Sequence, residues 1–327
     1  MIDTIYIEEA VSNHPRARQI IGRFPKAVQI PCERYGEVFN PNVQNFRLQK
    51  KNPALILAEK FDHFVLKAPS SYGIGSTHNY YFSHMLNCIY DCRYCFLQGM
   101  FRSANLVCFV NYEDFEHAIS ETIKQNEDAH FFSGYDCDSL ALEPVTGFAD
   151  SILDFFSQHP KSLVELRTKS VQIKSLLTRD PTQNCVVAFS LTPSQTAEKL
   201  EHGAPSLDKR LEAMEKLQER GWKLGLRFDP VIYSETFGKQ YEELFKNIFQ
   251  KIKIKNIHSV NLGSFRLPKD LYERMYRLYP DEKLFAGPLE EQKGMVTYTK
   301  EIEKKFENVT KMLLEFIPKS IFFPCYT

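Results

Sequence analysis

The chain has 327 residues, of which 43% are hydrophobic and 13% aromatic, which is enough apolar material for a sizeable core. Its 41 basic residues equal its 41 acidic residues, so a nucleic-acid partner would have to be held by a local basic surface and not by global charge. No apolar run approaches the ~20 residues that span a bilayer, and the start lacks a signal-peptide pattern, so we expect a cytoplasmic protein.

Residues 1–75 predict a mixed α/β segment, with a helix near residues 12–24 and a strand near residues 53–61. From residue 76 onward, short β-rich runs alternate with helical patterns. Six strands are expected, at 77–86, 129–134, 163–168, 185–191, 223–233 and 258–265. Helices are expected at 112–125, 145–158, 170–178, 206–221, 237–252 and 267–279.

Repeated βα units require parallel strands with right-handed crossovers. We therefore predict an α/β fold in which residues 76–280 form a partial (β/α)6 barrel of the TIM type. Residues 281–327 are expected to form a C-terminal extension, with a helix at 299–317 and then an aromatic tail. Ligand chemistry in such folds gathers at the C-terminal ends of the strands.

Three cysteines, Cys88, Cys92 and Cys95, directly follow the first expected strand in the spacing CxxxCxxC. In a reducing compartment the eight cysteines of the chain favour metal binding or reactive thiols over disulfides. Zinc prefers four ligands, and the next cysteines, Cys108 and Cys137, are isolated in sequence, so a zinc site is a strained alternative. A [4Fe-4S] cluster normally takes four thiolates, so three would leave one iron open for an exchangeable ligand.

This spacing, with aromatic residues Tyr94 and Phe96 on either side of the last cysteine, resembles the signature of the radical S-adenosylmethionine (radical SAM) superfamily. The resemblance implies that the methionyl amino and carboxylate groups of SAM chelate the open iron. It also implies that reductive cleavage of the sulfonium generates a 5′-deoxyadenosyl radical, a reaction that belongs to the cofactor and that the protein positions.

Within the superfamily, several stretches resemble the spore photoproduct lyase family, whose members split a methylene-bridged thymine dimer in DNA back to two thymines. These stretches are residues 92–99, 138–143, 165–170, 201–233, 265–280 and 323–327.

The resemblance implies that Lys169 and Ser190 hold the methionyl carboxylate, that Asp229 contacts SAM, and that Cys137 replaces a serine near the ribose. Ser139 is a further cofactor-binding candidate.

The positions of three of these cofactor-binding candidates in the expected strands support their assignment independently of the resemblance. Lys169, Ser190, Arg227 and Asp229 stand at or near strand ends, where a packed core does not explain so many charges, so Arg227 joins the cofactor-binding candidates. Lys169 and Arg227 have the alternative interpretation of satisfied helix-terminus or surface charges.

Three departures from the family concern the transfer of hydrogen atoms. Aligning Asp138 with the family aspartate places Cys137 two positions after the essential hydrogen-donating cysteine, about 7 Å along a strand, and puts Tyr135 in its place. Phe96 replaces a relay tyrosine and has no transferable phenolic hydrogen. The basic aromatic stretch before the last helix is shortened to residues 289–300 and keeps Tyr298.

Cys137, Tyr135, Tyr94 and Tyr298 are therefore the catalytic candidates, although Cys137 could equally be a buried small apolar side chain. The four cysteines outside this set and the cysteine loop are interpreted as such apolar side chains: Cys32, Cys108, Cys185 and Cys325. Cys325 would come near the cluster only if the tail folded back.

The favoured hypothesis is a monomeric radical SAM enzyme that repairs pyrimidine photoproducts in DNA, supplied with electrons by a reductant such as flavodoxin or ferredoxin. Arg266 and Lys269 follow the sixth expected strand and are the candidates for contacts with damaged DNA, which we expect to bind weakly and with strong salt dependence. The alternatives are an enzyme of the same fold that acts on another nucleic-acid lesion, RNA or a small molecule, and a non-catalytic module with a structural cluster.

Overall fold

The computed structural model describes residues 2–42, 44–69 and 72–325. Its largest sheet has seven strands in the order β14-β13-β11-β10-β9-β5-β4, and all neighbours are parallel except β4 and β5. The strands are β4 (Leu66–Lys67), β5 (Asn79–Phe82), β9 (His130–Ser133), β10 (Leu163–Thr168), β11 (Cys185–Ser190), β13 (Lys223–Val231) and β14 (Ile257–Ser264). The six expected strands follow one another across this sheet, which confirms the partial barrel, although the strand expected at 77–86 contributes only residues 79–82 and its last residues form a separate strand.

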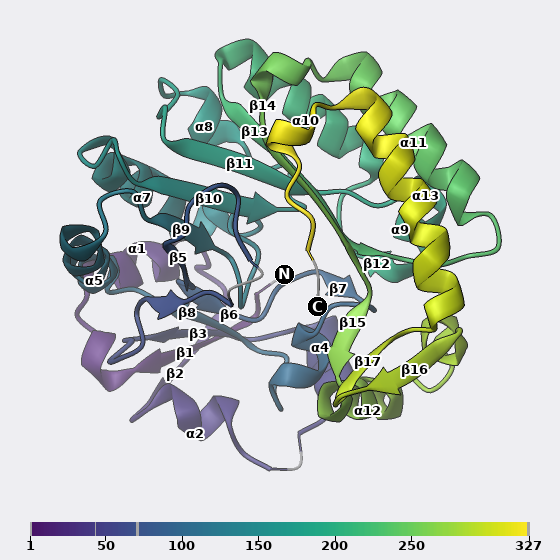
Figure 1. The fold of residues 1–327 in the computed structure, drawn as a ribbon. Helices are drawn as coiled ribbons and strands as arrows, with labels where there is room; N and C mark the ends of the chain where they lie inside the picture. The colour runs from purple at the N-terminus through teal and green to yellow at the C-terminus, as the bar shows by residue number, and fades with distance from the viewer. Residues whose placement is uncertain (1, 43, 70–71, 326–327) are drawn as a thin grey trace.

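Helices cross from each strand to the next and cover the outer face of the sheet (Figure 1). They are α5 (Tyr112–Gln125), α6 (Glu143–Thr146), α7 (Phe148–Ser157), α8 (Lys174–Leu177), α9 (Ser194–Leu200), α10 (Leu207–Arg220) and α11 (Phe237–Lys251). Helix α12 (Lys269–Leu278) comes after the last strand of this sheet and lies apart from these crossings. Helix α10 begins where Ser206 accepts a hydrogen bond from the backbone of Lys209 and ends at Gly221, whose φ is 93°. The helix expected at 145–158 is interrupted because Gly147 adopts a left-handed conformation, with φ of 60°.

A second sheet lies beside the first, with the strand order β2-β1-β3-β8-β6. Its strands are β1 (Thr4–Glu8), β2 (Val28–Cys32), β3 (Leu55–Ala58), β6 (Met85–Leu86) and β8 (Leu106–Phe109), and its helices are α1 (Pro15–Gly22), α2 (Tyr35–Phe39) and α3 (Phe46–Lys51). Strands β6 and β8 come from beyond residue 75, and the sequence patterns do not indicate β8. The cysteine-bearing loop between them therefore leaves the second sheet and returns to it.

The C-terminal region adds a three-stranded antiparallel sheet of β15 (Arg266–Pro268), β17 (Met295–Tyr298) and β16 (Leu289–Gln292), followed by helix α13 (Lys300–Phe316). Short 3-10 helices complete the chain: η1 (Glu9–Val11), η2 (Ile254–Asn256), η3 (Lys283–Ala286) and η4 (Lys319–Ile321). After η4 the tail turns back along β14, where Phe322 bridges Val260 and Cys325 bridges Gly263.

The main core fills the space between the barrel strands and their helices, and Trp222 is its largest fully buried side chain. A separate apolar cluster lies under the N-terminal sheet and includes Leu57, Met85, Cys108 and Cys137. No helix among the described residues is long and apolar enough to cross a membrane.

Candidate active site

The cysteine loop leaves β6 through Asn87, which is tied down before the first thiol. Asn87 has φ of 67°, and its side-chain amide donates to the carbonyl oxygens of Ser103 (2.7 Å) and Asn105 (2.8 Å). Asparagine tolerates this left-handed conformation better than most residues, and here its amide also ties the start of the loop to the segment that leads into β8. The loop therefore begins from a fixed point at the edge of the barrel.

One of the three thiols of the loop, that of Cys92, is buried, and those of Cys88 and Cys95 are partly buried. Cys92 lies in the short strand β7 (Asp91–Cys92), and the backbone N–H of Cys95 donates to the Cys92 carbonyl at 3.0 Å. The Cys88 sulfur accepts from the backbone N–H of Tyr90 at 3.4 Å. Helix α4 (Leu97–Met100) then carries the chain away from the loop.

The ionisation of these thiols is governed by burial and by two lysines. Burial raises the pKa of Cys88 to about 12, against the opposing effect of the Lys50 ammonium. Burial also raises the pKa of Cys92 and Cys95, and the Lys169 ammonium acts in the opposite direction on both. Lys169 and Lys50 are thus placed to balance negative charge on thiolates.

The donor set of the loop suits a [4Fe-4S] cluster better than a single metal ion. Among the described residues, no three His, Cys, Asp or Glu side chains gather tightly enough to hold a single metal ion. A [4Fe-4S] cluster makes a different demand, because each thiolate binds its own iron and the sulfurs stay apart. One buried and two partly buried thiols on a single loop, beside two ammonium groups, fit such a cluster.

The loop is supported from the barrel side by the segment that follows α9. Strand β12 (Glu201–His202) pairs antiparallel with β7, so that Glu201 lies opposite Cys92. The Glu201 carboxylate accepts hydrogen bonds from the Tyr94 hydroxyl and from the guanidinium of Arg210, which also donates to the Ser190 carbonyl at 3.0 Å. The family-like stretch 201–233 therefore begins as a support for the cysteine loop.

The predicted cofactor residues Lys169, Ser190 and Ser139 lie near the C-terminal ends of β10, β11 and β9, as their positions require. The Lys169 ammonium lies 5.4 Å from the centre of the Tyr94 ring. The Ser139 hydroxyl lies 2.7 Å from the Ser133 hydroxyl, and its closeness to Gly134 leaves no space for a Cβ there, which would be 2.5 Å from the Ser139 oxygen.

Arg227 and Asp229, both on β13, are engaged differently. Arg227 is fully buried inside the barrel, where it donates to Glu165 (2.6 Å) and to the Ser259 hydroxyl (2.9 Å). Its guanidinium is thus paired beneath the mouth of the barrel. The sequence suggested a contact with the cofactor or a charge at a helix terminus or on the surface, and neither describes this position. Asp229 lies at the mouth and accepts from Arg266 at 3.0 Å.

The four candidates for hydrogen transfer lie in different surroundings. Cys137 is buried in the cluster under the N-terminal sheet. Tyr298 is also buried, and its hydroxyl accepts from the Tyr233 backbone at 2.9 Å. Tyr94 is committed to Glu201, whereas Tyr135 is 39% exposed and packs on Phe96 with 5.2 Å between ring centres. Only Tyr135 of these four presents its ring to solvent beside the cysteine loop.

The two predicted DNA contacts are both ion-paired. Arg266 binds Asp229 and the Ser264 carbonyl oxygen at 2.8 Å. Lys269 is half exposed and binds Glu291 at 2.8 Å. A phosphate at Arg266 would therefore compete with the Asp229 carboxylate, whereas Lys269 can release a surface partner at small cost.

Comparison with known proteins decides the family. A model of the spore photoproduct lyase family matches residues 2–317. The chain belongs to the spore photoproduct lyase family. It is thereby a member of the radical SAM superfamily, whose members use a [4Fe-4S] cluster and SAM.

Two spore photoproduct lyases are similar to this chain along most of their length. The protein of Clostridium acetobutylicum is 24% identical over 292 residues, which are 87% of this chain and 84% of that protein. The protein of Bacillus subtilis is 23% identical over 290 residues, 86% and 83% of the two chains.

Solved structures of spore photoproduct lyase share the fold. One, complexed with dinucleoside spore photoproduct, has a TM-score of 0.85 at 18% identity and covers 100% of this chain and 98% of its own. A variant with bound AdoMet and the same dinucleoside has a TM-score of 0.85 at 19% identity, with the same coverage.

Sequence reasoning missed the acidic partners within this lyase-family site. Asp138 served only to align the sequence, yet its carboxylate accepts from the Thr168 hydroxyl (2.5 Å) and the Lys169 backbone (2.7 Å) and so fixes the end of β10. Glu165 and Glu201 stand inside family-like stretches but were not interpreted. For Glu165 a signal was available, since it is a carboxylate in a parallel strand that is otherwise largely apolar and a buried charge requires a partner.

Proposed function

We propose that this chain is a spore photoproduct lyase that restores two thymines from a methylene-bridged thymine dimer in DNA. The observation that carries the proposal is the three-thiol loop at the mouth of the barrel, in a chain that the family model matches almost from end to end. The curated relatives bear this name, and solved relatives hold AdoMet and the dinucleoside photoproduct.

Cys88, Cys92 and Cys95 would hold the cluster, which together with SAM supplies a primary carbon radical able to remove a hydrogen atom from the lesion. The chain itself binds and orients. Lys169 places an ammonium beside the thiols, where it can pair with the methionyl carboxylate, and Asp138 holds the Lys169 backbone. Glu201 and Arg210 keep the loop against the barrel and exclude water from behind it.

The lesion must leave the base stack to reach the mouth of the barrel, because its bridging carbons are covered within duplex DNA. Arg266 and Lys269 remain our proposed phosphate contacts. Arg227 and Tyr298 play a structural part in this proposal, since their polar groups are satisfied inside the protein.

The test is anaerobic turnover of the reconstituted protein with dithionite, SAM and dinucleoside spore photoproduct. We expect release of thymine dinucleotide and no reaction with the undamaged dinucleotide. Cys92→Ala should abolish turnover, whereas Cys32→Ala, which removes a thiol at the far end of β2, should not. Turnover of another lesion, or of none, in place of the spore photoproduct would contradict the proposal.

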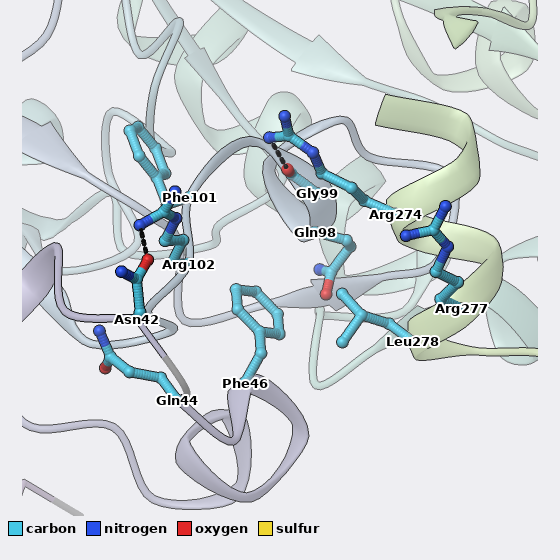
Figure 2. A pocket seen from close by; sticks show the side chains of 10 residues that line it. All are labelled: Asn42, Gln44, Phe46, Gln98, Gly99, Phe101, Arg102, Arg274, Arg277 and Leu278. Atoms are coloured by element: carbon cyan, nitrogen blue, oxygen red, sulfur yellow. Dashed lines mark hydrogen bonds between the residues drawn. The ribbon is translucent and has the colours of Figure 1, made fainter. Parts of the chain in front are cut away.

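We also infer that the reductant is an acidic electron-transfer protein of the flavodoxin or ferredoxin kind, docking near α4. A cavity of about 500 Å³ opens there, and Figure 2 shows three arginines on its walls, Arg102, Arg274 and Arg277. The Gln98 backbone N–H in the same wall donates to the Cys95 carbonyl at 3.0 Å, so the cavity adjoins the cysteine loop. Positive charge at this point would steer an acidic partner.

Charge reversal tests this docking face. Arg274→Glu with Arg277→Glu should slow turnover driven by a flavodoxin and leave turnover driven by dithionite unchanged. Lys216→Glu, on the exposed side of α10, is the matched control. Equal rates for the variant and the control with flavodoxin would contradict the inference. We propose a monomer, which light scattering of the purified protein would check.

A further inference from the structure

The C-terminal tail brings one cysteine to the mouth of the barrel. The backbone N–H of Phe323 donates to the Val260 carbonyl (2.8 Å), and that of Cys325 donates to the Leu262 carbonyl (3.0 Å). As far as Cys325, the tail thus runs parallel to β14 (Figure 1). The sequence interpretation of Cys325 as a core side chain does not describe this position.

The Cys325 sulfur lies on the inner face of the sheet. Side chains alternate along a strand, so Ser259, Asn261 and Gly263 of β14 share one face. Ser259 binds Arg227 inside the barrel, which identifies that face as the inner one. The Asn261 side-chain amide donates to the Cys325 sulfur at 3.3 Å.

A polar group without a partner accompanies this thiol. Asn261 is 3% exposed, and its Oδ1 atom has no hydrogen-bond partner in the part of the chain that the structure describes. Buried amide oxygens are rarely left unpaired, so a ligand that donates a hydrogen bond is expected beside them. The Asp229 carboxylate is close as well, because a Cβ on Gly263 would lie 2.8 Å from Asp229 Oδ1 and 2.9 Å from Cys325 Cβ.

Cys325 also borders a cavity of about 970 Å³ between the tail, the β16–β17 hairpin and α13. Among the residues that line this cavity are Gly263, Arg266, Lys293, Lys300, Lys304 and Cys325. The lining also includes Lys311 and two acidic residues, Glu303 and Glu307, so basic residues outnumber acidic ones by five to two. An excess of positive charge suits a nucleotide phosphate. The thiol therefore stands between the inner face of the sheet and a cavity with an excess of positive charge.

We propose that Cys325 is the thiol that donates the closing hydrogen atom in this chain, in place of the displaced Cys137; this rests on the proposed function. The Cys325 S–H bond breaks, and a C–H bond forms at the carbon radical left on the separated thymine. The Cys325 thiyl radical then regains a hydrogen atom from 5′-deoxyadenosine, the nucleoside that formed when the 5′-deoxyadenosyl radical took a hydrogen atom from the lesion. One hydrogen atom thus leaves and one returns, and no external oxidant or reductant is consumed in this step.

The first test needs no turnover. Labelling of the resting protein with N-ethylmaleimide, read by peptide mass spectrometry, should modify Cys325, and dinucleoside spore photoproduct should suppress this modification. Undamaged dinucleotide should not suppress it. Unchanged labelling of Cys325 with a saturating amount of the photoproduct would overturn the proposal.

The second test follows deuterium. A thiol exchanges its hydrogen with solvent, so turnover in deuterium oxide should place deuterium in the repaired thymine. Cys325→Ala should lose this deuterium and lower repair per SAM cleaved about tenfold, while SAM cleavage continues. Cys32→Ala is the matched control and should keep the isotope.

Loss of deuterium in Cys137→Ala or Tyr135→Phe, but not in Cys325→Ala, would overturn the assignment. Absence of lesion-dependent SAM cleavage in the parent protein would instead defeat the proposed function. If so, the N-ethylmaleimide experiment by itself still shows whether the photoproduct covers Cys325.

Discussion

At the scale of single residues, the barrel interior depends on the ion pair between Glu165 and Arg227. Burial raises the pKa of Glu165, but the charges of Arg227 and Arg167 outweigh it and hold that pKa below 4.5, its ordinary value. Arg227→Met leaves the carboxylate with Arg167 alone, so we expect a loss of about 3 kcal/mol in the free energy of unfolding by urea at pH 7.

The pH dependence of this loss follows from the same shift. The folded protein holds the Glu165 proton less tightly than the unfolded chain, so the stabilisation is complete at neutral pH and is lost as the pH falls below 4.5. The difference between parent and Arg227→Met should therefore shrink in acid. The double variant Arg227→Met with Glu165→Leu should recover stability at pH 7, and a single variant as stable as the parent would refute the account.

At the scale of elements, β12 and the start of α10 hold the cysteine loop in place. Arg210→Met would leave Glu201 buried without its guanidinium, and we expect both a loss of about 3 kcal/mol in stability and faster loss of iron in air. Arg220→Met, at the exposed end of the same helix, is the matched control. Iron retention in Arg210→Met equal to that in the control would show that the support is dispensable.

Some helices and strands could be predicted from the sequence, and others could not. The six barrel strands and the helix at 206–221 were foreseen because their periodicity and caps are local. The function of the stretch 201–210 was not, because β12 pairs with β7 more than a hundred residues away in sequence. Strand β8 was missed since it joins a sheet built mainly by the first 60 residues.

At the scale of the whole molecule, charge balance and fold-back of the tail set the properties of the mouth of the barrel. Neither the placement of Cys137 under the N-terminal sheet nor that of Cys325 beside Asp229 follows from local sequence, because both depend on which sheet a distant segment joins. The three cluster cysteines were predictable because one loop carries them all.

Binding of DNA should rest on a few phosphate contacts, since the chain has no net charge. With about three contacts, the affinity for photoproduct-containing duplex should fall about 40-fold between 50 and 200 mM salt, measured by fluorescence anisotropy. Lys293→Ala, in the lining of the cavity beside Cys325, should reduce the slope of log affinity against log salt concentration by about one. Lys253→Ala, on another surface, should not, and an affinity independent of salt would contradict this view.

The account as a whole requires that three thiolates hold an iron–sulfur cluster and leave one iron for SAM. The most direct measurement is electron–nuclear double resonance on the reduced protein with SAM labelled by ¹⁵N at its methionyl amino group. We predict a ¹⁵N coupling to the cluster that disappears when SAM is omitted. A spectrum without that coupling, or a colourless protein that contains zinc, would contradict the central claim.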